Sequence, residues 1–91
     1  MTHDISQLIE RALEGDQKAY TDIVARFREQ IYHFIFRMVK DKAQAEDLTQ
    51  ETFLKALGTL QTLRRPEAVR SWLLGILRNM IRESARRMAR Q

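Results

Sequence analysis

The 91 residues of the chain have a mass of 10.8 kDa, which supports one modest hydrophobic core and a single domain. The sequence holds no cysteine, which excludes disulfide frameworks, cysteine-based zinc sites and thiol nucleophiles, and it holds no apolar run long enough to span a membrane. Its net charge is +4, and three glycines and one proline leave little turn chemistry. We therefore expect an all-α protein, a compact bundle of three to four helices with no sheet, located in the cytoplasm.

The first two expected helices follow from apolar residues at helical spacing. Gly15 is expected to end the first helix, and Asp16 to cap the second. The second helix should run from about residue 18 to residue 39 in the centre of the bundle, because apolar residues cover so much of its girth. The first stripe comprises Ile5, Leu8, Ile9, Ala12 and Leu13. The second comprises Tyr20, Ile23, Val24, Phe27, Ile31, Phe34, Ile35 and Met38.

Two further helices are expected in the second half of the chain. Asp41 and Gln44 have the spacing of a capping box, so the third helix should begin near Lys42. Residues from about 58 to 65 lose the pattern and should form a loop, and Pro66 suits the first turn of the fourth helix. The expected buried face of the third helix comprises Leu48, Thr52, Phe53, Ala56, Leu57 and Leu60. That of the fourth comprises Val69, Trp72, Leu73, Ile76, Leu77, Met80 and Ile81.

A second stripe on the expected third helix is not explained by folding. It consists of Asp47, Gln50, Glu51 and Leu54, at spacing i, i+3, i+4 and i+7, and is called the acidic stripe below. A leucine among carboxylates is typical of a surface that meets a basic partner, because the charges steer the encounter while the leucine buries apolar area. The alternative is that the carboxylates only stabilise the first half of their own helix through its dipole.

Positive charge is concentrated at the C-terminal end of the chain. Residues 64–91 hold eight arginines against two glutamates, a net charge of +6, and no lysine. The planar arginine side chain suits phosphates and base edges, so we expect nucleic acid binding, with a merely solvated helix face as the alternative. Trp72 could stack on an unpaired base or begin the apolar stripe as a core residue. The candidate DNA-binding residues are Arg64, Arg65, Arg70, Trp72, Arg78, Asn79, Arg82 and Arg86.

No catalytic residue, metal site or cofactor is expected. The sequence has no phosphate-binding glycine loop, no nucleophile elbow and no zinc-binding His-Glu motif. Its two histidines, His3 and His33, are isolated and far apart. We therefore expect a binding protein and not an enzyme.

Three separated motifs resemble one family of proteins. Residues 45–57 (AEDLTQETFLKAL) resemble region 2.2 of bacterial sigma factors of the extracytoplasmic-function (ECF) group. Residues 71–79 (SWLLGILRN) resemble their regions 2.3–2.4, and residues 15–20 and 31–34 are similar to regions 1.2–2.1. The resemblance covers almost the whole chain in the family's order and spacing.

The resemblance implies a domain that binds the clamp helices of the β′ subunit of core RNA polymerase. It also implies recognition and opening of the promoter −10 element, whose non-template strand is held as single-stranded DNA. By this resemblance the acidic stripe is the clamp surface, the loop of about residues 61–70 captures a flipped base, and the arginine and asparagine face of the fourth helix holds the strand. An anti-sigma factor is a further partner implied by the family, and no membrane is.

Residues 1–91 are expected to form one sigma region 2 domain, spanning regions 1.2 to 2.4. The family's region 4 domain, which reads the −35 element, is absent from this chain, so we expect an excised fragment or a stand-alone region 2 protein. Two other functions stay open. One is a small helical module that sequesters another regulator without binding DNA, and the other is a bundle that coats nucleic acid without sequence preference.

Overall fold

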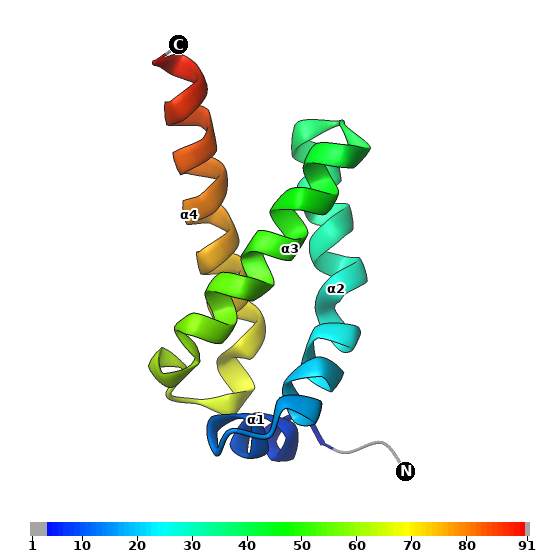
Figure 1. Cartoon of the computed structure of the whole chain (residues 1–91), viewed down its shortest axis with the longest axis vertical. Helices are drawn as coiled ribbons and strands as arrows, with labels where there is room; N and C mark the ends of the chain where they lie inside the picture. The colour runs from blue at the N-terminus through cyan, green and yellow to red at the C-terminus, as the bar shows by residue number, and fades with distance from the viewer. Residues whose placement is uncertain (1–3, 91) are drawn as a thin grey trace.

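The computed structural model describes residues 4–90, except for the side chain of Met88. The described residues contain no strand, so the expected all-α bundle is confirmed. Figure 1 shows α1 lying across the base of the molecule, below the long helices α2, α3 and α4. The elements in chain order are α1 (Ile5–Leu13), α2 (Gln17–Val39), α3 (Lys42–Gly58), the short 3₁₀ turns η1 (Leu60–Thr62) and η2 (Pro66–Ala68), and α4 (Val69–Ala89).

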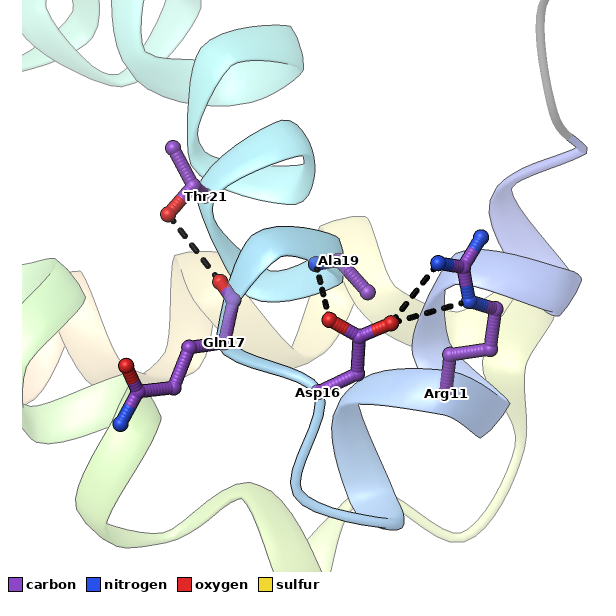
Figure 2. A network of polar contacts seen from close by, with 5 residues as sticks. All are labelled: Arg11, Asp16, Gln17, Ala19 and Thr21. Atoms are coloured by element: carbon purple, nitrogen blue, oxygen red, sulfur yellow. Dashed lines mark hydrogen bonds and ion pairs between the residues drawn. The ribbon is translucent and has the colours of Figure 1, made fainter.

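The turn between α1 and α2 is fixed by the two residues expected to form it. Gly15 has a φ of +100°, a left-handed conformation that glycine adopts without strain. Asp16 caps α2: one carboxylate oxygen accepts the backbone N–H of Ala19 at 3.2 Å, and the other accepts two N–H groups of Arg11 at 2.7 Å and 3.1 Å (Figure 2). The Ala19 hydrogen bond first, and then the Arg11 guanidinium, lower the pKa of Asp16.

The turn between α2 and α3 is one residue shorter, and it too ends in an aspartate that caps the next helix. Lys40 adopts a left-handed conformation with a φ of 55°, and its N–H donates to the carbonyl of Phe36 at 2.8 Å. Asp41 then caps α3 by accepting the backbone N–H of Gln44 at 3.0 Å. The expected start of the third helix near Lys42 is thus confirmed, and α3 folds back directly along α2.

The hydrophobic core draws residues from all four helices and from the segment before α4. Two threonines of α3, Thr49 and Thr52, are fully buried in it, and their hydroxyls donate to the carbonyls of Ala45 and Leu48 at 2.7 Å. Because each hydroxyl is satisfied within its own helix, the polar atoms cost little in the core. The other large side chains that are fully enclosed are Leu8, Ile9, Ile35, Leu73, Leu77 and Met80.

Two residues assigned to buried faces are exposed. Leu57 is 51% exposed, although it directly follows the buried Ala56. The buried face of α3 centres on Ala45, Thr49 and Ala56, and each successive residue lies about 100° further round the helix, so Leu57 points away from that face. Met38 is 55% exposed, because α4 leaves a groove beside it instead of packing against it. The placement of both side chains in the core was wrong.

Candidate functional site

The acidic stripe lies on the face of α3 that points away from the core. All four of its residues are exposed, and Leu54 is 62% exposed. Within residues 4–90, neither Asp47 nor Glu51 forms an ion pair with another side chain. The spacing argument therefore placed these residues correctly on one open face, while their role remains a prediction.

A groove of about 480 Å³ runs between α2 and α3 beside this face. Asp47, Gln50 and Leu54 line the groove, whereas Glu51 lies outside it on the outer surface of α3. Three stripe residues thus share one concave surface with α2. The other lining residues are Tyr20, Val24 and Arg28 of α2 and Glu46, Thr49, Phe53 and Leu57 of α3.

Leu57 joins Leu54 in an exposed apolar pair at this groove. The two side chains are three residues apart on α3, so they are neighbours on its surface. An apolar centre with a charged rim is the usual anatomy of a protein interface. Sequence reasoning assigned Leu57 to the core, because its position also fits the helical spacing of the buried face. Its spacing of three residues from Leu54 could have placed it beside the acidic stripe.

Tyr20 ties the two walls of the groove together. Its hydroxyl donates to the backbone carbonyl of Phe53, which joins α2 to α3. Burial raises the pKa of Tyr20 to about 12, so the hydroxyl remains a donor well into alkaline solution, beyond the pH at which an exposed tyrosine ionises. The acidic stripe is therefore presented on a helix whose distance from α2 is fixed.

The basic face of α4 lies opposite its buried residues. Arg78, Asn79, Arg82 and Arg86 are all exposed on it. In the described part of the chain these three arginines, like Arg64 and Arg65, form no ion pair. The nearby carboxylate of Glu83 lies 3.5 Å from Nζ of Lys55 on α3. The positive charge of the face is therefore free to meet phosphates.

The arginines of the basic face of α4 divide between two hollows, whereas Arg70 lines a third one of about 160 Å³ against α2. Arg78 and Arg82 line a groove of about 320 Å³, together with Phe34 and Met38 of α2. Arg86 lines a second one of about 260 Å³, together with Glu83, Arg87 and Arg90. Sequence reasoning did not name Arg87 or Arg90 as site residues, although both belong to the basic segment that it identified.

Arg70 and Trp72 lie on opposite sides of α4. Nη2 of Arg70 donates to Oε1 of Gln30 at 3.1 Å, which places Arg70 against α2. Nε1 of Trp72 donates to Oγ1 of Thr62 at 3.0 Å, which places Trp72 against the segment that follows α3. Residues two positions apart in a helix lie about 200° apart around its axis. The eight DNA-binding candidates therefore do not form one patch. The ring of Trp72 is partly buried and packs against the core.

The structure shows neither a metal site nor a membrane span in the region that it describes. Within residues 4–90, no group of three His, Cys, Asp or Glu side chains is placed to hold a metal ion. None of the helices over the same residues combines the length and the hydropathy needed to cross a bilayer.

The chain is similar to a family of known proteins over most of its length. The Sigma-70 region 2 family profile matches residues 23–91. The chain is 37% identical over 76 residues to the ECF RNA polymerase sigma factor BldN of Streptomyces coelicolor, covering 82% of this chain and 29% of that protein. It is 37% identical over 73 residues to the RNA polymerase sigma-H factor of Pseudomonas aeruginosa, covering 80% and 38%. It is 32% identical over 76 residues to the ECF RNA polymerase sigma factor SigW of Bacillus subtilis, covering 84% and 41%. The chain thus spans less than half the length of these relatives.

Proposed function

The chain belongs to the sigma-70 region 2 family, and from that membership we propose that it is the part of a transcription initiation factor that binds core RNA polymerase and recognises the promoter −10 element. The observation that carries the proposal is that one bundle presents two charged surfaces, the acidic stripe of α3 and the arginine face of α4, whose charges form no ion pair within residues 4–90. In this role the chain supplies binding energy and specificity in the cytoplasm, while the polymerase performs the chemistry.

The acidic stripe is proposed to bind the clamp helices of the β′ subunit. Leu54 and Leu57 would bury apolar area at the centre of the contact, and Asp47 and Glu51 would meet basic residues of the partner. An anti-sigma factor that competes with polymerase would cover the same surface.

The arginine face is proposed to hold the non-template strand of the −10 element as single-stranded DNA. Arg78, Arg82 and Arg86 would contact phosphates, and the segment of residues 61–70 would receive a flipped base. Extruding a base from the duplex costs a few kcal/mol, which contacts to the flipped base and to the strand must offset. Asn79 would read a base edge, because its amide both donates and accepts.

Replacing Asn79 by alanine is expected to reduce sequence preference, not general affinity. The DNA ligand is first selected: the chain, bound to core polymerase, is mixed with a random pool of short single-stranded DNAs. The sequence that becomes enriched is called the preferred strand below. We expect Asn79→Ala to lose about tenfold in affinity for the preferred strand and little for a scrambled strand, because a lost base contact costs about 1–3 kcal/mol. Fluorescence anisotropy with both strands measures the difference.

The control for this substitution is Gln7→Ala, which removes an exposed amide from α1 and should leave both affinities unchanged. Equal losses on the preferred and scrambled strands would contradict base reading and make Asn79 a structural residue.

A further inference from the structure

The segment that joins α3 to α4 is held down from inside the bundle. Leu60 and Leu63 are 6% and 5% exposed, so both side chains anchor the segment in the core. The backbone N–H groups of Thr62 and Leu63 donate to the carbonyls of Thr59 and Leu60 at 2.9 Å and 3.0 Å. Two exposed arginines, Arg64 and Arg65, follow directly after this anchored turn.

Trp72 of α4 also holds this segment in place, through a hydrogen bond. Its Nε1 donates to Oγ1 of Thr62 at 3.0 Å, and the hydroxyl of Thr62 donates in turn to the carbonyl of Thr59 at 2.7 Å. A threonine hydroxyl has one hydrogen to give and lone pairs to accept with, so both contacts are satisfied at once. These two hydrogen bonds are called the Trp72–Thr62 latch below.

The latch connects two points that are ten residues apart in the chain and encloses the stretch that carries Arg64, Arg65 and Arg70. A stretch fixed at both ends has fewer conformations to lose when a ligand binds to it. The latch therefore lowers the conformational entropy that this stretch would lose on binding a ligand.

We propose that Trp72 is a positioning residue that holds the stretch between Thr62 and Trp72 in place for the −10 strand, and that no base stacks on it. The inference rests on the proposed function, because it takes the stretch to be a contact site for single-stranded DNA. The indole N–H is already engaged by Thr62, and the ring is packed against the core. Turning the ring outward to meet a base would break the latch and expose apolar area.

The first test concerns the latch itself and needs no DNA. The chain has a single tryptophan, so its indole N–H gives one signal in a ¹⁵N-resolved NMR spectrum. We expect Thr62→Val, which removes the acceptor at nearly constant shape, to speed hydrogen exchange of that N–H. Thr62→Ser keeps the hydroxyl and should leave the exchange rate as in the wild type. An unchanged exchange rate in Thr62→Val would overturn the latch.

The second test measures binding to the preferred strand on core polymerase. We expect Trp72→Phe, which removes the hydrogen bond to Thr62, to weaken this binding about fivefold, the effect of losing one net hydrogen bond. Thr62→Val removes both hydrogen bonds of the latch and should weaken it at least as much, with Thr62→Ser close to the wild type. The slope of affinity against salt should not change, because no charge is removed. With Trp72 incorporated as 5-hydroxytryptophan, which is excited apart from the tryptophans of the polymerase, binding of the strand should leave the fluorescence of this residue nearly unchanged, whereas a stacked base would quench it.

The matched control is Thr21→Val on α2, where an exposed hydroxyl also donates to a backbone carbonyl, that of Gln17, at 3.1 Å (Figure 2). It should leave strand binding unchanged. Strong quenching of Trp72, or wild-type affinity in both Thr62→Val and Trp72→Phe, would overturn the positioning role and leave the proposed function standing. Selection of no preferred strand by the wild-type chain would instead overturn the proposed function, and this inference with it.

Discussion

Replacing Glu51 by arginine is expected to abolish binding of the chain to core RNA polymerase while leaving the helical fold intact. Glu51 is exposed and has no ion pair within residues 4–90, so the substitution breaks no contact inside the described bundle. At the interface it would place a positive charge against a basic partner, and like charges brought together there cost several kcal/mol. The dissociation constant should rise by at least about a hundredfold.

The measurement is titration of labelled chain with sigma-free core polymerase, followed by fluorescence anisotropy. Circular dichroism of the variant checks that the helices are retained. The matched control is Glu10→Arg, which makes the same change of charge at an exposed position of α1 and should bind as the wild type does. Wild-type affinity in Glu51→Arg would remove the acidic stripe from the interface.

The affinity of the chain for single-stranded DNA is expected to fall steeply as the salt concentration rises. If about five arginines neutralise phosphates, the affinity should fall on the order of a hundredfold between about 50 mM and about 200 mM salt, because each contact releases a counterion. The candidates for these contacts are Arg64, Arg65, Arg78, Arg82 and Arg86, which are exposed and have no ion pair in the described chain. Arg82→Gln should lower the slope of log affinity against log salt by about 0.7.

The control for the slope is Arg37→Gln on the exposed face of α2, which should leave it unchanged. The titration also separates the competing functions. A module that only sequesters a protein regulator would show no DNA binding, and a nonspecific coating bundle would show the steep slope without any preferred strand. A shallow slope, of about one contact or less, would contradict the proposed role of the arginine face.

The starts of α2 and α3 were predictable because local chemistry sets them, whereas α4 begins only at Val69, after the 3₁₀ turn that contains Pro66. Gly15, Asp16 and Asp41 act through hydrogen bonds and backbone angles within a few residues of themselves, which a sequence displays directly. Burial was less predictable, because it depends on which neighbour covers a face. Leu57 and Met38 continue their stripes in sequence, yet they are 51% and 55% exposed and line open grooves between helices.

The same distinction applies to the candidate site. The acidic stripe belongs to one helix, so its spacing alone put its residues on a common face. Arg70 and Trp72 were grouped with the arginine face because they are close in sequence. Their positions are set by Gln30 and Thr62, which are 40 and 10 residues away in the chain. No pattern within α4 reveals such partners.

The most direct test of the central claim is whether the chain transfers strand recognition to core polymerase. Labelled preferred strand is mixed with core polymerase alone, with polymerase and the wild-type chain, and with polymerase and the Glu51→Arg variant, and the retained strand is measured by gel shift. Our account predicts a polymerase-bound strand only with the wild-type chain, with a scrambled strand left free. Equal retention by core polymerase alone, or by the Glu51→Arg mixture, would contradict it.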